Sequence, residues 1–399
     1  MNTKNNNFYL NSFLFLILIF LYYLVSENYL VFYVGRYFDG CDMMWSPSSL
    51  YLQNINVFDI YFSELKDNYI HCSNYPSYSI SNIFFMLPFG AFELDLAKKL
   101  WLAFNIVLIA HLYFIYKSFF SQNVFGYTLI YLIFLFSKPM IFTLAIGQYG
   151  ILALWGITVC IVYEKNKLVS FAGYFLSGLK YTFFPIIFFY SFYKKNFFLI
   201  LLFILINVFA LSAFSFKFDT SIITNFFNPL IVGSQQGGGG GDLMSVLGNH
   251  PTFPFNYIII LGTSFFYFLI FWTKTYNNTE NRIIYISLIT ITIFRHHIYD
   301  AIFLMPMFIY LCKSKNKLKI IMIIIILYFW FIYHSNFLEQ GSLIPVMYTK
   351  GFRIFNFILL NFLLAFIFLD NLKPNQSILK FKTDKLKRKF NNYDIKFKL

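Results

Sequence analysis

The sequence predicts an all-α membrane protein whose helices cross the bilayer many times. Of its 399 residues, 59% are hydrophobic and 12% are charged, and the mean hydropathy is +0.63. A soluble domain carries about 25% charged residues, so this chain could not cover a water-facing surface. Apolar runs long enough to span a bilayer recur from end to end. An extended soluble domain, a coiled coil and a disordered chain are therefore excluded.

The positive charge indicates how the chain is oriented. The net charge is +14, but the basic residues cluster in short linkers between apolar runs, which is the pattern of cytoplasmic loops. The sequence has no glycine-rich phosphate loop and no basic-aromatic RNA motif, so we exclude nucleic acid as a partner. The four cysteines lack metal-ligand spacing, and we expect no metal and no cofactor. Cys41 and Cys72 fall in one expected outer loop, where they could pair in an oxidising compartment.

The apolar runs define the expected elements in order. The first run, residues 8–34, is too long for a signal-peptide core and lacks a small-residue cleavage site, so it predicts an uncleaved anchor. A polar outer loop follows over residues 35–79 and carries five acidic residues, Asp39, Asp42, Asp59, Glu64 and Asp67. Further apolar runs predict helices at residues 98–118, 124–137, 149–163, 168–193, 197–215, 254–273, 282–312, 319–333 and 353–370.

The linkers decide how these runs thread the membrane. All basic linkers face the cytoplasm if runs 168–193 and 282–312 each cross outward and return, with a break in the middle. A full span needs about 20 residues, so these two runs would contain tilted or half helices, and the short run 80–92 would be re-entrant or interfacial. This path predicts about 12 membrane segments, in a range of about 10 to 13, and two cytoplasmic termini. Residues 1–372 then form one membrane domain, followed by a basic cytoplasmic tail, residues 373–399. The linker residues are Lys165 with Lys167, Lys194 with Lys195, Lys274 with Arg282, and Lys313, Lys315, Lys317 and Lys319.

Several polar interruptions reach the outer face on this path. They are the first loop, the break at 138–149, the turn near Lys180, the glycine loop at 233–250 and the cluster at 295–300. Irregular backbone and ionisable side chains are tolerated at membrane depth only where they line a wet cavity enclosed by protein. Each charge facing lipid would cost about 2.5–3.5 kcal/mol. We therefore expect one polar cavity that opens outward.

Asp42 and Asp39 are the candidates for a general base at the mouth of this cavity. A carboxylate there could accept the proton of an attacking sugar hydroxyl without help from a metal. The alternative is that either residue is simply solvated in a loop.

Basic residues in two apolar runs are candidates for binding an anion. Lys180 either extends its amine to the membrane interface or binds the phosphate of a lipid-linked substrate. Arg295, His296, His297 and Asp300 form the densest polar cluster in any apolar run. The cluster is either an interhelical hydrogen-bond network or a site where Arg295 and a protonated histidine stabilise an anionic leaving group while Asp300 orients a histidine. Adjacent helical residues face different ways, which disfavours a metal held by His296 and His297.

These pieces, in this order, resemble glycosyltransferase family 87, a group of GT-C membrane enzymes of the polyprenyl-phosphate-mannose type. The resemblance covers about residues 35–312. It is carried by Asp42-Met43-Met44-Trp45, by Asn74-Tyr75-Pro76-Ser77 through Leu87-Pro88-Phe89 to Leu100-Trp101 and Asn105, by Gly147-Gln148-Tyr149-Gly150, by Ala172-Gly173 through Leu179-Lys180 and Pro185, and by His297-Ile298-Tyr299-Asp300. Ser77 and Tyr181 stand where the family has prolines.

The resemblance implies a GT-C helical bundle in the plasma membrane with its active site on the outer face. It also implies inverting transfer of a hexose, mannose-like, from a polyprenyl-phosphate donor to a hydroxyl of a glycan or glycolipid acceptor of the cell envelope. Asp42, or Asp39 in its place, would be the general base. The implied substrate-binding residues are Lys180, Arg295, His296, His297, Tyr299, Asp300, Gln148 and Tyr75.

Two other classes of membrane protein share some of these features. Broken helices with charges at membrane depth also build the substrate sites of transporters, so a transporter or flippase for an anionic or lipid-linked substrate is the main alternative. The sequence shows no internal repeat relating its halves, which counts against it. A polymerase or ligase of the O-antigen type usually has a large outer loop late in the chain, whereas the loop from His334 to Arg353 is short.

Overall fold

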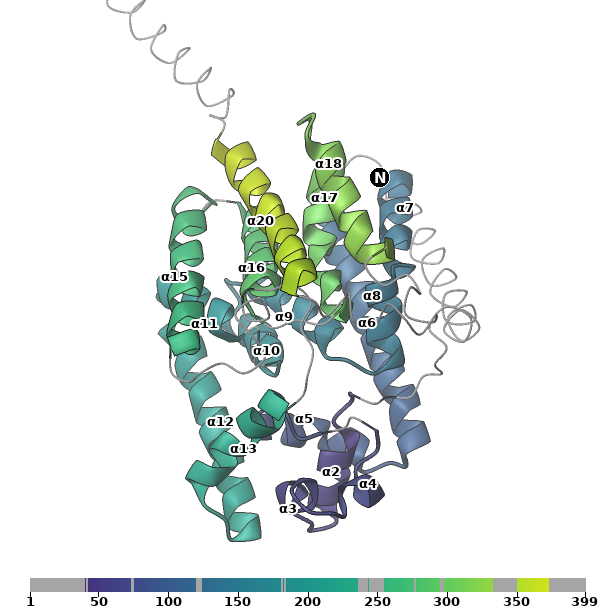
Figure 1. Ribbon diagram of the computed structural model, residues 1–399, viewed down its shortest axis with the longest axis vertical. Coiled ribbons are helices and arrows are strands. Elements are labelled where there is room, and N and C mark those ends of the chain that lie inside the picture. The colour runs from purple at the N-terminus through teal and green to yellow at the C-terminus, as the bar shows by residue number, and fades with distance from the viewer. Residues whose placement is uncertain are drawn as a thin grey trace, which may run out of the picture.

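The structure, a computed structural model, is helical throughout the part of the chain that it describes (Figure 1). No strand occurs among these residues, so the predicted all-α class is confirmed. The described residues are 40, 42–72, 75–119, 124–180, 182, 184–235, 243, 255–275, 278–294, 298–332 and 350–372. The expected anchor at 8–34, most of the glycine loop and the basic tail lie outside them.

Three helices of the described chain are long and apolar enough to cross a membrane. They are α6 (Leu94–Phe119), α12 (Phe197–Phe218) and α20 (Lys350–Leu372). Helices α7 (Val124–Leu135) and α8 (Lys138–Ala145) would form a fourth span if the pair, bent by 54°, is counted as one. The chain is therefore a membrane protein by helix length and composition, while the larger expected number of segments stays a prediction.

Helix α8 corrects one expectation, because residues 138–149 were expected to break the helical run. Instead Ser137 is extended and a new helix starts at once, with Pro139 in its first turn. Proline is tolerated there because a first-turn N–H has no partner inside the helix. The irregular backbone is thereby confined to the few residues after Ala145.

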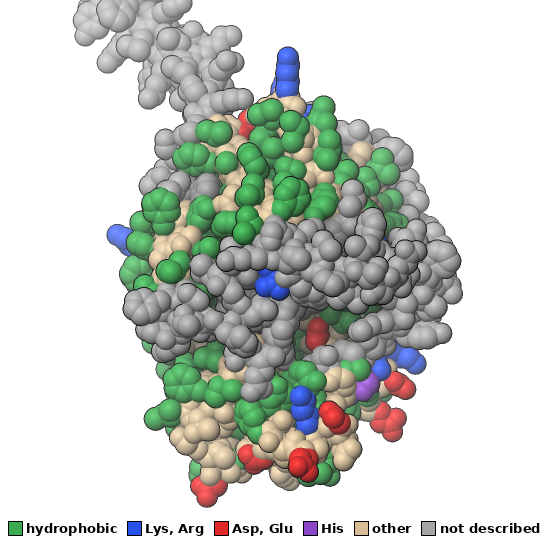
Figure 2. Space-filling view, in the orientation of Figure 1, with side chains coloured by type: hydrophobic (Ala, Val, Ile, Leu, Met, Phe, Trp, Pro, Cys, Tyr) green, Lys and Arg blue, Asp and Glu red, His purple; other side chains and the backbone are tan. Residues whose placement is uncertain are grey.

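The acidic outer loop is also more ordered than its polar sequence suggests. It folds into α2 (Trp45–Leu52), α3 (Val57–Tyr61) and α4 (Lys66–Tyr69), which lie at the lower end of the molecule in Figure 1 beside α5 (Ile80–Gly90). Ser48 Oγ donates to the Ile83 carbonyl at 3.0 Å. A Cβ on Gly90 would lie 2.8 Å from Ser48 Cβ, so the glycine permits the close approach of α2 and α5. Acidic side chains gather at this end in Figure 2. Asp59, Glu64 and Asp67, which belong to this segment, are exposed.

Run 168–193 turns back on itself, as predicted. It forms α10 (Lys167–Gly178) and α11 (Phe184–Tyr193), and α10 packs against α9 (Gly150–Val162). A Cβ on Gly156 would lie 2.6 Å from the Gly173 carbonyl oxygen, so two glycines let the backbones of α9 and α10 touch. Beyond α11, Lys194 Nζ lies 3.2 Å from a Glu164 carboxylate oxygen in the loop before α10, so both ends of the run meet.

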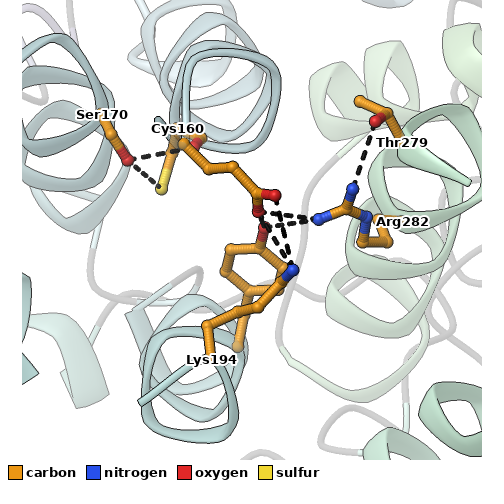
Figure 3. Close-up of polar contacts among 7 residues, drawn as sticks. Cys160, Ser170, Lys194, Thr279 and Arg282 are labelled. Carbon is orange, nitrogen blue, oxygen red and sulfur yellow. Dashed lines mark hydrogen bonds and ion pairs between the residues drawn. The ribbon is translucent and has the colours of Figure 1, made fainter. Parts of the chain in front are cut away.

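Run 282–312 has the same out-and-back path. It comprises α16 (Thr279–Ile293), the 3₁₀ helix η1 (Ile298–Leu304) and α17 (Met305–Lys313). Lys313 Nζ donates to Glu280 at 3.2 Å, which brings its two ends together. Arg282 donates to Glu164 at 2.8 Å, and Figure 3 shows the Arg282 and Lys194 side chains pointing toward the same carboxylate. The basic linkers expected on one side of the membrane thus meet at one end of the bundle.

The remaining helices are α13 (Ile222–Gln235), α15 (Phe255–Thr275), α18 (Lys319–Leu327) and the π-helix η2 (Tyr328–Ile332).

Candidate functional site

The first outer loop is bound to the irregular turn between α8 and α9. The Asp42 N–H donates to the Ile146 carbonyl at 2.8 Å, and the Gly40 N–H donates to Ala145 at 3.3 Å. The side chains also meet, because Gln148 Nε2 donates to Asp42 Oδ2 at 2.6 Å. The candidate base therefore has its backbone and its carboxylate fixed by the same turn.

A glycine makes this turn possible. Gly147 has φ +72°, in the left-handed region that a residue with a Cβ adopts only at a cost. A Cβ there would also lie 3.0 Å from Met43 Cβ, so the outer loop could not sit as close. The Gly147 carbonyl accepts from Trp101 Nε1 at 2.9 Å, and this bond anchors the turn to α6. The Gly-Gln sequence thus positions a buried amide beside Asp42.

Gln148 connects the candidate base to the start of α5. Its side chain is buried, and its Oε1 accepts from the Tyr78 hydroxyl at 3.2 Å while its Nε2 donates to Asp42. The two partners fix which end of the amide carries the oxygen. Tyr78 also packs on the ring of Tyr149, with centroids 5.1 Å apart. Asp42, Gln148 and Tyr78 therefore form one connected polar group.

Lys180 and Asp300 form a buried ion pair. Lys180 lies in the break between α10 and α11, Asp300 lies in η1, and their side chains are only 6% and 2% exposed. Such burial removes both charges from water, and the attraction between the two side chains offsets part of that cost. The orientation of a histidine by Asp300, one of the two roles considered for the 295–300 cluster, stays a prediction because His296 and His297 lie outside the described residues.

The two polar groups flank the same turn. A Cβ added to Gly150 would lie 3.7 Å from Asp300 Oδ1. Gly150 is two residues beyond Gln148, a separation that spans at most about 7 Å of chain. The turn therefore brings Asp42 and Gln148 to the neighbourhood of Lys180 and Asp300, which lie 138 and 258 positions after Asp42 in the sequence.

Two further buried polar atoms lie at the Lys180 break. Asn82 Nδ2 donates to the Leu179 carbonyl at 2.9 Å and ties α5 to the break. Asn82 Oδ1 and Thr182 Oγ1 have no hydrogen-bond partner within the described chain, although both residues are buried. A buried polar atom without a partner costs free energy, so these two atoms suit a polar ligand. Neither residue was a candidate in the sequence, where an isolated Asn and Thr carry no signal.

An apolar groove of about 320 Å³ adjoins the break. Ser81 and Phe184 line it, and they are next to Asn82 and two residues from Thr182 in the chain. Ser77 and Ser79 line it on either side of Tyr78. Its walls come from α5, α12 and α13, and they include Phe203, Ile204, Val208, Leu211, Phe226 and Leu230. We call this cavity the α12–α13 groove.

The other predicted residues lie elsewhere or outside the described part. Tyr75 packs against Tyr61, with ring centroids 5.3 Å apart, and Lys66 Nζ lies 4.3 Å from its ring centroid. Tyr78, three residues later, contacts Gln148. Asp39, Arg295, His296 and His297 are not described, and for Tyr299 only the backbone within η1 is.

The outer loop carries a disulfide. Cys72 is disulfide-bonded, whereas Cys160 and Cys312 are free. Cys41, which could pair with Cys72 according to the sequence, lies outside the described residues. The described residues contain no group of three or more His, Cys, Asp or Glu side chains that could hold a metal ion.

Comparison of the chain with protein-family models, with curated proteins and with solved structures gave no match. The chemistry of the site is therefore inferred from its own residues.

Proposed function

We propose that this protein is a membrane glycosyltransferase that moves a hexose from a polyprenyl-phosphate donor to a hydroxyl of a glycan or glycolipid acceptor. One observation carries the proposal. The apolar α12–α13 groove adjoins the buried polar break at Lys180, and the turn between α8 and α9 brings the carboxylate of Asp42 to the neighbourhood of that break. The groove suits a prenyl chain, the break suits a phosphate, and the carboxylate suits a base.

The α12–α13 groove supports a lipid-linked donor. Its lining is mostly phenyl and aliphatic, so a prenyl chain would lose little by leaving the bilayer for it. Its lining serines and asparagines, Ser77, Ser79, Ser81, Asn207 and Asn225, give the groove a polar part. A lipid with an apolar tail and a polar head has the same asymmetry.

Lys180 and Thr182 would receive the donor phosphate. The lysine amine and the threonine hydroxyl are hydrogen-bond donors, and a phosphate oxygen accepts strongly from both. Asp300 pairs with the buried lysine and holds its amine in place before the donor arrives. Arg295 and the two histidines precede η1 in the sequence and are proposed to add positive charge around the leaving group.

Asp42 is proposed as the general base. As the acceptor hydroxyl oxygen attacks the anomeric carbon, its proton passes to the Asp42 carboxylate. The bond between that carbon and the phosphate oxygen breaks, and its electron pair leaves with the polyprenyl phosphate. A single displacement inverts the anomeric centre. The amide of Gln148, bonded to Oδ2, holds the carboxylate in one orientation during the transfer.

We also propose how the protein is oriented in the membrane. The disulfide at Cys72 suits an oxidising compartment, and the basic linkers at the opposite end suit the cytoplasm. We therefore propose that the α2–α4 end faces outward from the plasma membrane, with about 12 membrane segments and both termini inside.

A transfer assay tests the proposal. Membranes that contain the protein are incubated with several labelled prenyl-phosphate sugars, and the products are analysed. Asp42→Asn should lower turnover by about 10²–10⁴-fold with donor binding unchanged, whereas Asp59→Asn, which removes an exposed carboxylate of the same loop, should leave it unchanged. Normal transfer by Asp42→Asn together with loss in Asp39→Asn would move the base to Asp39.

A transporter or flippase is the second candidate, and the buried Lys180–Asp300 pair in a break between helices favours it. Ligand-driven flux in proteoliposomes, with no product from any prenyl-phosphate sugar, would select this candidate over the transferase.

A further inference from the structure

A second groove, of about 370 Å³, lies on the outer-loop helices. It runs between α2, α4 and the start of α6, and we call it the α2–α4 groove. The side chains that give it chemical character are Trp45, Gln53, Asp67, Asn68, Tyr69 and His71. It shares no lining residue with the α12–α13 groove.

The side chains of this groove suit a neutral sugar. A pyranose has apolar C–H faces that pack on aromatic rings, here Trp45 and Tyr69, and hydroxyls that both donate and accept. Gln53 and Asn68 each offer a donor and an acceptor, and Asp67 accepts. None of the described residues lining the groove is a lysine or arginine, and Asp67 repels anions. The phosphate chemistry of the Lys180 break is therefore absent from this groove.

Parts of the groove are already fixed before any ligand binds. Trp45 Nε1 donates to the Phe92 carbonyl at 3.0 Å, which holds the indole in one orientation. Gln53 Nε2 donates to Ser49 Oγ at 3.1 Å, and the His71 N–H donates to Ser46 Oγ at 2.9 Å. Fixed side chains lose less entropy on binding than mobile ones. Tyr69, 45% exposed, remains accessible from solvent.

The groove begins close to the proposed base. Trp45 follows Asp42 by three residues, so their Cα atoms are at most about 11 Å apart. Met44 between them has φ 60°, a left-handed turn that ends the loop and starts α2. The Trp45 end of the groove therefore lies close to the Asp42 backbone.

We infer that the α2–α4 groove binds the neutral sugar residues of the acceptor and directs one hydroxyl toward Asp42. This inference rests on the proposed function, because it assigns the second substrate of the same site. The two substrates then occupy separate grooves, one apolar for the lipid donor and one polar for the acceptor sugar.

Binding of labelled oligosaccharides tests the inference. The full chain in nanodiscs is titrated with fluorescent trisaccharides built from mannose, glucose, galactose or N-acetylglucosamine. Tyr69→Ala and Asn68→Ala should weaken binding of the trisaccharide that binds the wild type by about tenfold or more, which is about 1.4 kcal/mol. Phe62→Ala and Glu64→Ala, exposed neighbours outside the groove, should not. In transfer assays the groove variants should raise the acceptor KM and leave kcat and donor binding unchanged.

The outcomes separate this inference from the proposed function. If no trisaccharide binds the wild type, or if the groove variants bind as well as the wild type, the inference is overturned, and transfer by the wild type would still support the transferase. If the groove variants lose sugar binding but the wild type transfers no sugar from any prenyl-phosphate donor, the groove is supported as a sugar site and the transferase assignment fails.

Discussion

Removing one partner of the Lys180–Asp300 pair should destabilise the protein strongly. Because the side chains are 6% and 2% exposed, water screens both charges poorly, and Lys180→Met would remove the described counter-ion of a buried Asp300. Breaking a buried pair in this way costs about 3–5 kcal/mol. A folded domain is stable by only about 5–15 kcal/mol, so the loss is a large fraction of the total. Asp300→Leu should cost a similar amount.

The double variant is the decisive measurement. Replacing both partners with apolar side chains of similar size removes the uncompensated charge, so Lys180→Met with Asp300→Leu should recover most of the loss. Unfolding of the purified protein in detergent, followed by circular dichroism over a denaturant series, gives the free energies. Lys194→Met is the matched control, because its ion pair with Glu164 is more exposed and should contribute about 0–1 kcal/mol. If the two single losses simply add in the double variant, within about 0.5 kcal/mol, the pair is not formed.

Three other substitutions test separate parts of the structure. Gln148→Leu removes a hydrogen bond to a charged carboxylate, which is worth about 1.5–3 kcal/mol. The steady-state rate of transfer should therefore fall about 10–150-fold. A rate equal to that of the wild type would refute the role of Gln148 in positioning Asp42. Gly147→Ala, at φ +72° and 3.0 Å from Met43 Cβ, should lower the free energy of unfolding by about 1–2 kcal/mol, and an unchanged value would contradict the turn. Burial raises the pKa of Glu164, but its bonds to Tyr190, Arg282 and Lys194 outweigh burial and hold that pKa below its ordinary 4.5. A depressed carboxyl pKa contributes stability above the unfolded pKa and loses it as the pH falls through the folded pKa. The melting temperature of the wild type should therefore fall below about pH 4.5, and it should fall more than the melting temperature of Glu164→Gln. If the two melting temperatures change with pH in parallel, the contacts of Glu164 contribute nothing to stability.

Much of the helical architecture follows from local sequence. The runs at 98–118, 197–215 and 353–370 appear as α6, α12 and α20 with ends shifted by a few residues. The two out-and-back runs were predicted because basic linkers at both ends had to face the same side. The local pattern predicted helices wrongly where a polar or interrupted segment is nevertheless helical. The acidic loop forms α2–α4, and residues 138–145 form α8, although both looked like interruptions of the apolar pattern.

The site was only partly visible in the sequence. Lys180 and Asp300 stood out because ionisable side chains are costly in apolar runs. Asp42 stood out as a carboxylate of the outer loop, and Gln148 through the Gly-Gln element of the family resemblance. Their pairing was not visible, since nothing in the chain order indicates that Asp300 meets Lys180 or that Gln148 meets Asp42. The contact of Tyr78 with Gln148 was also not visible, because no local pattern shows which tyrosine faces the turn after α8.

The sequence alone therefore determined that this protein lies in a membrane, that its described part is helical, and which polar side chains had to find partners. Those properties depend on composition and on the local spacing of apolar residues. Only the tertiary structure decided which partner each polar side chain found and where the two grooves lie. The physical reason is that an ion pair or a groove requires residues far apart in the chain to be brought together, and local spacing does not specify their distance.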